Sequence, residues 1–332
     1  MKLSQFDYVL PKELIAKYPL RERDKCRLIV LDREKRSIAH KTFEDIIGYF
    51  NKGDLLVLND TKVIPARLFG RRKTGGKVEL FLLEKKDPTC EALVRPSGRL
   101  KEGEKVILES GAGAELLGRG KIGRFVRFNR PIDEILESGH VPLPPYIDRF
   151  DEPDDRESYQ TVYAAKEGAT ASPTAGLHFT IDMLDRLVSN GVRLANVTLH
   201  TNYGTFAPVK TESVENHKMH KEYFNIPGET IEAVMKTKKS GGKIVAVGTT
   251  SARSLEYWAK EGNTEGDNDL FIYPGFEFKI VDRLITNFHL PKSTLMLLVS
   301  AFAGKDFIFE AYSRAIEERY RFFSYGDSML IL

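Results

Sequence analysis

The chain has 332 residues, 42% of them hydrophobic and 29% charged, which is the composition of an ordinary soluble globular protein and excludes a disordered one. Its N-terminus lacks the apolar run of a secretion signal, and its longest nearly apolar stretch, 294–303, is about half of a membrane span. Cys26 and Cys90 stand alone, without metal-type spacing, so we expect a reducing cytoplasm and no membrane. The net charge of +3 does not by itself indicate nucleic acid.

The first 62 residues predict a mixed α/β segment. Two strands are expected at 26–32 and 37–43, joined by a charged turn, and a short amphipathic helix follows at 43–53. Residues 54–61 read DLLVLNDT, a buried strand that ends in polar residues.

From 63 to about 130 the pattern changes to short β-type runs with glycine turns between them. The runs are KVELFLLE, EALVRP, KVILES and RFVRF, and no long helical pattern interrupts them. Such a series predicts a small barrel. A short helix at 131–139 and a proline-rich, acidic linker at 141–155 follow.

After residue 156 helices and strands alternate, as in βα units around a largely parallel sheet. The fold class we expect is α/β: a mixed, largely parallel sheet flanked by helices, with an inserted small β-barrel domain. The strand at 54–61 belongs to the same sheet in this interpretation. Residues 1–62 and 152–332 then form one discontinuous α/β domain, and 63–151 form the insertion.

Polar groups follow four of the predicted sheet strands, where ligands of parallel α/β sheets bind. One such ending is typical of a helix cap, but four together predict a ligand site. These residues are Asn59, Asp60 and Thr61; His200 and Thr201; Gly248, Thr249 and Thr250; and Asn287 and His289.

The stretch GTTSAR, 248–253, offers free backbone N–H groups at a helix start, which is an anion-binding arrangement but not a phosphate-binding P-loop. Arg253, one turn in, is a candidate for clasping a carboxylate. The alternative for Arg253 is a surface salt bridge with Glu256.

Residues 172–180, SPTAGLHFT, place His178 after a run of near-minimal side chains. The simple interpretation is a turn. The functional one is that Pro173 to Gly176 let the backbone approach a ligand, with the His178 imidazole beside it.

The stretch HKMHKEY places His217 and His220 three residues apart, on one face if the segment is helical. Together with Glu222 they suit acid–base or hydrogen-bonding roles. No HExxH pattern or nearby cysteine accompanies them, so we expect no metal. His40 and His140 are interpreted as a strand-surface and a linker histidine.

The positive charge is concentrated in the predicted insertion: residues 63–151 hold 17 Lys and Arg against 13 Asp and Glu, a net +4. One interpretation is a solvated strand edge guarded by positive charge. The other is a surface that contacts the phosphates of a nucleic acid. The candidates for that contact are Arg67, Arg71, Arg72, Lys73, Arg124 and Arg127.

Eight motifs, in order along nearly the whole chain, resemble the S-adenosylmethionine:tRNA ribosyltransferase-isomerases of queuosine biosynthesis. They are GDLLVLNDTKVIPARLFG (53–70), VPLPPYIDR (141–149), YQTVYA (159–164), SPTAGLHFT (172–180), ENHKMHKE (215–222), VGTTSARSLE (247–256), DRLITNFHLPKSTLMLLVSAFAG (282–304) and YRFFSYGDSML (320–330). The chain departs from the family pattern at Asn202 and Tyr203, where a more glycine-rich run is usual, which puts the local pocket shape in doubt.

The resemblance implies transfer of the ribosyl moiety of S-adenosylmethionine to a 7-aminomethyl-7-deazaguanine at the wobble position of tRNA. The ribose rearranges, epoxyqueuosine forms, and adenine and methionine leave. S-adenosylmethionine is then a consumed cosubstrate, no other cofactor is expected, and we expect a monomer.

Histidine suits the proton transfers that this reaction needs. The sequence does not assign the individual roles to the candidates. These are His178, His200, His217, His220 and His289, with the carboxylates Asp60 and Glu222. Contacts to S-adenosylmethionine are expected from Asn59, Thr61, Gly176, Phe179, Gly248, Thr249, Thr250, Arg253 and Asn287; Phe179 is a cation–π candidate for the sulfonium. The alternatives are a non-catalytic tRNA-binding module and an S-adenosylmethionine-dependent RNA methyltransferase.

Overall fold

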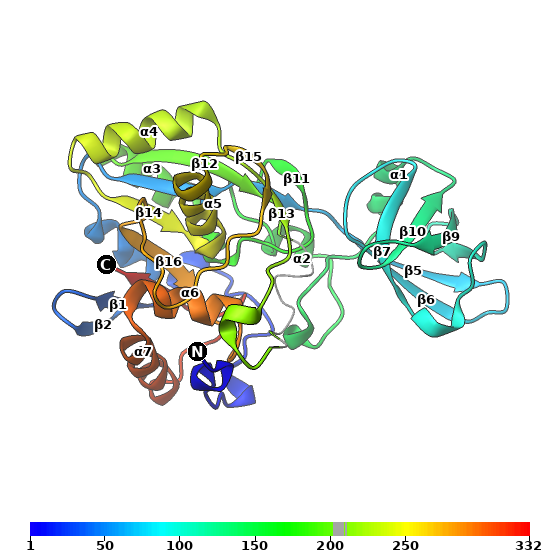
Figure 1. Ribbon diagram of the computed structural model, residues 1–332, viewed down its shortest axis with the longest axis horizontal. Coiled ribbons are helices and arrows are strands. Elements are labelled where there is room, and N and C mark those ends of the chain that lie inside the picture. Colours follow the sequence, from blue (N-terminus) through cyan, green and yellow to red (C-terminus); the bar gives the residue numbers. More distant parts are fainter. Residues whose placement is uncertain (202–208, 210) are drawn as a thin grey trace.

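The computed structural model describes residues 1–201, 209 and 211–332. It has two parts: a larger α/β part, which contains both chain termini, and a barrel that projects from it (Figure 1). This arrangement is the expected α/β fold with an inserted small barrel.

A mixed sheet forms the centre of the α/β part, and its nine strands within the described residues follow the order β15-β13-β12-β3-β14-β16-β17-β1-β2. The central strands β12, β3, β14 and β16 are parallel, and antiparallel pairs lie on both sides of them. Their bounds are β1 (Arg27–Asp32), β2 (Ser37–Thr42), β3 (Leu55–Asn59), β12 (Arg193–Leu199), β13 (Glu222–Asn225), β14 (Ile244–Val247), β15 (Glu265–Asn268), β16 (Arg283–Asn287) and β17 (Ser328–Ile331).

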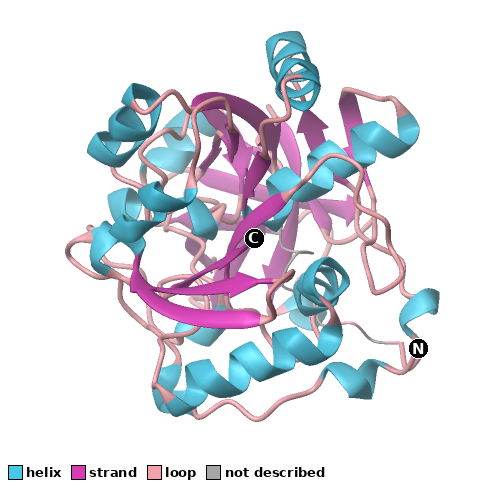
Figure 2. Ribbon diagram, turned by 90° about the vertical axis from the view of Figure 1, so that its left-hand side faces the viewer, coloured by secondary structure: helices cyan, strands magenta, loops and turns pink. Residues whose placement is uncertain are grey.

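Helices cover both faces of this sheet (Figure 2). In β3, Leu55 and Val57 pack on the side of helices α4 to α7, whereas Leu56 and Leu58 pack on the side of α3 and the 3-10 helix η4. All four side chains are buried because alternate residues of a strand point to opposite faces. The helices are η4 (Phe43–Tyr49), α3 (Ile181–Ser189), α4 (Gly228–Lys239), α5 (Gly248–Glu261), α6 (Thr294–Ala303) and α7 (Lys305–Glu317).

The structure adds short elements that periodicity did not reveal. Strands β13 and β15 extend the sheet at one edge, and β17 lies between β16 and β1 and joins the β1–β2 hairpin to the central strands. The short strands β4 (Thr61–Val63) and β11 (Lys166–Ala169) pair in parallel. The remaining short helices are η1 (Leu3–Phe6), η2 (Lys12–Leu14), η3 (Arg23–Lys25), η5 (Ser97–Arg99), η6 (Pro145–Ile147), α2 (Asp155–Ser158), η7 (Thr174–Gly176) and η9 (Val214–Asn216).

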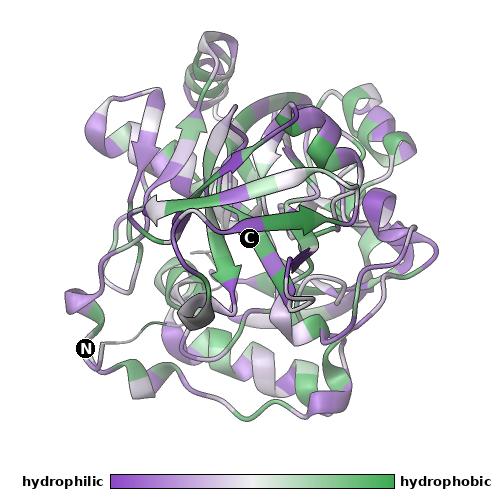
Figure 3. Ribbon diagram, turned by 90° about the vertical axis from the view of Figure 1, so that its right-hand side faces the viewer, coloured by the Kyte–Doolittle hydropathy of each residue, from purple (hydrophilic) through white to green (hydrophobic). Residues whose placement is uncertain are grey.

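The barrel is closed and antiparallel, with the strand order β10-β7-β6-β5-β8-β9. Buried and exposed residues alternate along β7 and β8, and Figure 3 shows hydrophobic and hydrophilic positions following each other along the barrel strands. This alternation fills the interior with aliphatic side chains and leaves the charges outside. The elements are β5 (Arg67–Arg72), β6 (Lys77–Leu82), β7 (Thr89–Arg95), β8 (Lys105–Leu108), β9 (Gly113–Arg119), β10 (Arg124–Phe128) and the short helix α1 (Ile132–Glu137).

No helix in the described part of the chain is both long enough and apolar enough to cross a membrane.

Candidate functional site

The parallel strands β12, β3, β14 and β16 end at one edge of the sheet, where a cavity of about 220 Å³ opens. Its polar lining includes Ser172, Thr174, Thr249, Asn287 and His289, and Phe288, Leu290, Leu295 and Phe323 add apolar walls. An apolar cavity with a few convergent polar groups is typical of a small-molecule site. The volume is below the range of about 300–1,000 Å³ that is usual for such sites.

Residues 248–250 are the first residues of α5, and they line one end of the cavity. Gly248 has a φ of 84°, a left-handed conformation that glycine adopts without strain, and it turns the chain from β14 directly into the helix. Helix α5 therefore begins at Gly248, directly after β14, and places a helix start at the GTTSAR stretch. Thr249 and Thr250 line the cavity from this first turn, where backbone N–H groups have no helical partners.

Asn59 ties three strand ends together from a fully buried position. Its Nδ2 donates to the carbonyl of Leu199 at 3.0 Å and to Thr250 Oγ1 at 3.2 Å. Its Oδ1 accepts the backbone N–H groups of Leu199 and Thr61. Asn59 thus holds the cavity rim in place and has no capacity left for a ligand.

Asp60, Thr61 and His200 form a second polar group beside the cavity. His200 Nδ1 lies 2.7 Å from Thr61 Oγ1, and its ring stacks on Tyr223 with centroids 5.5 Å apart. Partial burial lowers the pKa of His200, while the nearby Asp60 carboxylate acts to raise it. Asp60 Oδ1 accepts the hydroxyl of Thr198 at 2.6 Å. Asn202 and Tyr203 follow shortly in the chain, outside the described residues.

His289 is the one predicted histidine that lines the cavity among the described residues. Its Nε2 lies 2.8 Å from Thr286 Oγ1, and its backbone N–H donates to the hydroxyl of Tyr312. Burial lowers the pKa of His289 to about 3, so the ring is neutral at pH 7.

His178 is close to the cavity but faces away from it. Its Nδ1 lies 3.2 Å from Cys26 Sγ, and its Nε2 accepts a hydrogen bond from Asn287 Nδ2 at 3.1 Å. Burial, with a smaller contribution from Arg321, lowers the pKa of His178 to about 3. Both ring nitrogens have protein partners, and His178 lines a separate cavity of about 470 Å³ together with Cys26, so it does not line the cavity at the sheet edge.

What His178 does is orient Asn287, which lines the cavity. The other Nδ2 hydrogen of Asn287 goes to the carbonyl of Phe323 at 3.3 Å, and Oδ1 accepts the hydroxyl of Thr174 at 3.0 Å. The Nδ2 group of Asn287 donates to two acceptors, and its Oδ1 accepts from a hydroxyl donor. These partners distinguish the nitrogen from the oxygen, so the orientation of the amide is determined.

The side chain of Tyr163, in the YQTVYA motif, lies against the backbone of Gly176. A Cβ at Gly176 would lie 1.9 Å from the Tyr163 hydroxyl oxygen, and no positive φ is needed there. At Gly176 the group that lies against the backbone is therefore a side chain of the protein, whereas the predicted approach was that of a ligand. Pro173 to Ala175 do line the cavity.

Two further predicted contacts do not fit the structure. Phe179 is fully buried in the core, edge-on to Phe43, and is therefore not available to a sulfonium. Arg253 forms a buried ion pair with Glu222 between α5 and β13 through Nη1, and its Nε donates to the carbonyl of Leu270, so the carboxylate that it clasps belongs to the protein. The alternative partner Glu256 instead accepts the backbone N–H groups of residues 279–281.

His217 and His220 do not lie on a helix face, because 217–221 is irregular chain between η9 and β13. His217 is half-buried against Phe271 and His220 is exposed. Burial, and the neighbouring His220, lower the pKa of His217. Among the described residues no cluster of three His, Cys, Asp or Glu side chains could hold a metal ion.

The six basic residues predicted to contact phosphates differ in how far their side chains are engaged by other groups of the protein. Arg124 donates to the backbone carbonyls of Leu100 and Leu117, which makes it a structural residue. Three of the others form ion pairs with neighbouring glutamates: Arg67 with Glu79, Arg72 with Glu104 and Arg127 with Glu115. Arg71 donates a hydrogen bond to the carbonyl of Gly75. Lys73 is exposed.

Some residues that line the cavity were not predicted from the sequence. These residues are Tyr146, Thr286 and Phe323, and each lies in one of the family motifs. A motif does not by itself show which of its side chains faces the cavity. The positive φ of Phe323, 70°, turns this part of the C-terminal motif toward the cavity and has no signal in the sequence.

A model of the queuosine biosynthesis protein family matches residues 3–331. This chain belongs to the queuosine biosynthesis protein family. Two curated relatives carry the name S-adenosylmethionine:tRNA ribosyltransferase-isomerase: one from Sulfurihydrogenibium sp. is 56% identical and one from Thermotoga maritima 52% identical, each over all of both chains.

A solved structure of an S-adenosylmethionine tRNA ribosyltransferase from Thermotoga maritima superposes with a TM-score of 0.58. It covers 99% of this chain and 100% of its own, with 41% identity in the structural alignment. For a member of the queuosine biosynthesis family, the cavity at the sheet edge is the candidate active site.

Proposed function

We propose that this protein is an S-adenosylmethionine:tRNA ribosyltransferase-isomerase. It transfers the ribosyl moiety of S-adenosylmethionine to the aminomethyl group of a 7-deazaguanine at the tRNA wobble position and isomerises it, which gives epoxyqueuosine and releases adenine and methionine. It acts as a monomer in the cytoplasm and consumes S-adenosylmethionine without another cofactor.

The observation that carries this proposal is the full-length family match combined with the position of the cavity. Family motifs that lie far apart in the chain (172–180, 247–256 and 282–304) all contribute to its wall. A protein that only binds phosphates does not require an enclosed site of this kind, so the geometry favours an enzyme over a tRNA-binding module.

We assign the chemical step to the cavity face that carries His289. The reaction needs a base to remove a proton beside the sulfonium, and the neutral imidazole of His289 can serve as that base once the bound substrate raises its pKa from about 3 toward the working pH. His200 with Asp60 is the second candidate pair for proton transfer. The first turn of α5 suits the carboxylate of the methionine portion, because its N–H groups and dipole favour an anion.

The test is incubation with ribose-labelled S-adenosylmethionine and tRNA that carries the 7-aminomethyl-7-deazaguanine. We expect free adenine, free methionine and label in the tRNA, and no reaction with tRNA that has guanine at the wobble position. Formation of S-adenosylhomocysteine would instead identify a methyltransferase, and tRNA binding without adenine release would identify a binding module.

A further inference from the structure

Phe150 lies at the junction between the two parts of the molecule and is 76% exposed. It belongs to the segment that joins the barrel to the α/β part, and the site described above does not use it. Its ring contacts the barrel through Phe69, edge-on, with centroids 6.2 Å apart.

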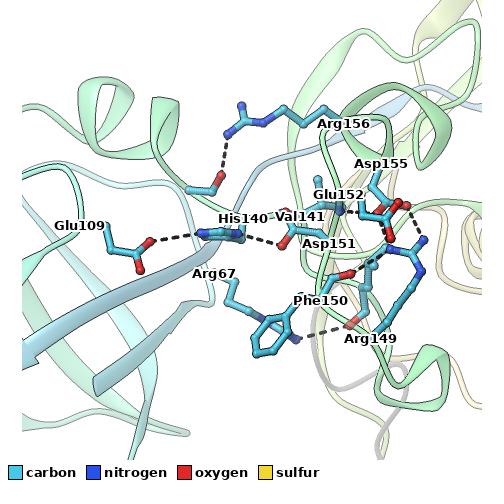
Figure 4. A network of polar contacts seen from close by, with 12 residues as sticks. Arg67, Glu109, His140, Val141, Arg149, Phe150, Asp151, Glu152, Asp155 and Arg156 are labelled. Carbon is cyan, nitrogen blue, oxygen red and sulfur yellow. Dashed lines mark hydrogen bonds and ion pairs between the residues drawn. The ribbon is translucent and has the colours of Figure 1, made fainter. Parts of the chain in front are cut away.

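The neighbours of Phe150 hold its backbone in place (Figure 4). Arg149 forms two hydrogen bonds to the carboxylate of Asp155, at 2.6 and 2.8 Å. On the other side, Asp151 accepts the backbone N–H of Val141 and lies 2.8 Å from His140 Nδ1. The ring is therefore presented to solvent by a fixed segment, which lowers the entropy cost of binding to it.

Two cavities meet at Phe150, and both contain cationic side chains. One, of about 440 Å³, lies between the barrel and the α/β part and includes Arg67, Arg95 and Arg149, with Glu79 and Asp148 as the acidic residues. The other, of about 620 Å³, lies on the barrel side and includes Arg71, Arg72 and Lys77, with Glu109, Asp151 and the imidazole of His140. Arg71, Lys77 and Arg95 are exposed.

The first of these cavities shares walls with the candidate active site. In the segment 170–172, Thr170 lines the junction cavity, whereas Ala171 and Ser172 line the active-site cavity. Tyr146 lines the active site, and Pro145 beside it lines the junction. Thr170 is buried at this boundary, so the two cavities lie on either side of one short, packed segment of the chain.

We propose that Phe150 is a stacking platform for an unpaired base of the tRNA anticodon loop, next to the base that enters the active-site cavity. An exposed aromatic ring flanked by Arg and Lys side chains is the usual means of holding single-stranded nucleic acid. The proposal rests on the proposed function, because only a tRNA substrate places unpaired bases beside the reacting one.

The experiment compares Phe150→Ala, Phe150→Leu and Phe150→Trp with Phe125→Ala as the matched control. Phe125 lies on β10 and is 39% exposed. Affinity for the tRNA is measured by anisotropy, and an anticodon stem-loop with 2-aminopurine beside the wobble position reports stacking by its fluorescence. Thermal melting and S-adenosylmethionine affinity establish that each variant is folded.

We expect the Ala and Leu variants to bind tRNA about 5- to 150-fold more weakly, because stacking on an aromatic ring contributes about 1–3 kcal/mol. The Trp variant keeps wild-type affinity and 2-aminopurine quenching, and Phe125→Ala changes neither. Wild-type tRNA binding in Phe150→Ala, or equal losses in the Ala and Trp variants, would overturn the platform. A wild-type protein that releases no adenine would overturn the proposed function instead.

Discussion

Burial at His289 determines which protonation states this residue can use. With a pKa of about 3 it is neutral at any pH at which the enzyme would work. It can therefore accept a proton, or hydrogen-bond a substrate, but it does not begin the reaction as an imidazolium.

The change His289→Gln should lower turnover by roughly 10²–10⁴-fold, the usual contribution of acid–base catalysis, with S-adenosylmethionine affinity nearly retained. Single-turnover adenine release measures the effect, and Thr286→Val is the control for loss of the neighbouring hydroxyl. An acid limb near pH 6.5 that disappears with His289→Gln would contradict the neutral, buried ring.

His178 illustrates how a candidate base becomes a positioning residue. The change His178→Ala should lower turnover about 10²-fold by freeing the amide of Asn287. Asn287→Ala should have a similar effect, and the double variant should be no worse than either, since both remove the same arrangement.

The conservative change His178→Gln is the diagnostic variant, because its amide can replace both hydrogen bonds and restore part of the turnover. The ratio of kcat to KM for each variant is the measurement. Full additivity of the two alanine changes would show that His178 does not act through Asn287.

At the scale of elements, η7 is shaped by its contact with Tyr163. The change Gly176→Ala places a methyl group against the Tyr163 hydroxyl and should lower the free energy of unfolding by about 1–3 kcal/mol. Urea denaturation measures this. Tyr163→Phe alone should be nearly neutral, because the buried hydroxyl has no partner to lose, and it should partly rescue Gly176→Ala.

Gly228→Ala is the matched control, because a Cβ there meets nothing within 4 Å and the residue begins helix α4. A large loss in Gly228→Ala, or none in Gly176→Ala, would contradict the steric account.

At the scale of the whole molecule, stability should fall as the solution is acidified below pH 6.5. His178 and His289 have pKa values of about 3 when folded and near 6.5 when unfolded, so the unfolded chain binds more protons between these values. Each histidine should cost about 2 kcal/mol of unfolding free energy between pH 7 and pH 5.

Denaturation in urea at both pH values tests this, and His289→Gln should remove one of the two contributions. Equal pH dependence in the wild type and in this variant would show that His289 titrates normally in the folded protein.

The positive charge of the barrel is also a property of the whole molecule, because it affects how the protein binds tRNA. The paired change Arg71→Glu and Lys73→Glu should weaken tRNA binding and reduce the salt slope of log K by about 2, because two phosphate contacts are lost. The matched control reverses Lys236 and Lys239, which are exposed on α4, far from the barrel (Figure 1). An unchanged salt slope would mean that the barrel charges only keep the protein soluble.

Much of this protein was determined by the sequence alone, because local patterns carry that information. The alternation of helices and strands indicated the sheet, and the short β-type runs separated by glycine turns indicated the barrel. The polar residues that follow the strands indicated the edge of the sheet where the cavity lies. Since parallel strands bring their carboxyl ends to one side, Thr249, Asn287 and His289 had to lie near one another.

Only the tertiary structure decided which of these residues face the cavity. His178 and His289 are both buried and both lie in motifs of the family, yet one contacts Cys26 and Asn287 while the other lines the cavity. Phe179 and Arg253 were assigned to a ligand on residue type, but packing placed one in the core and the other against Glu222. The direction in which a side chain points depends on contacts across the chain, and no local pattern encodes them.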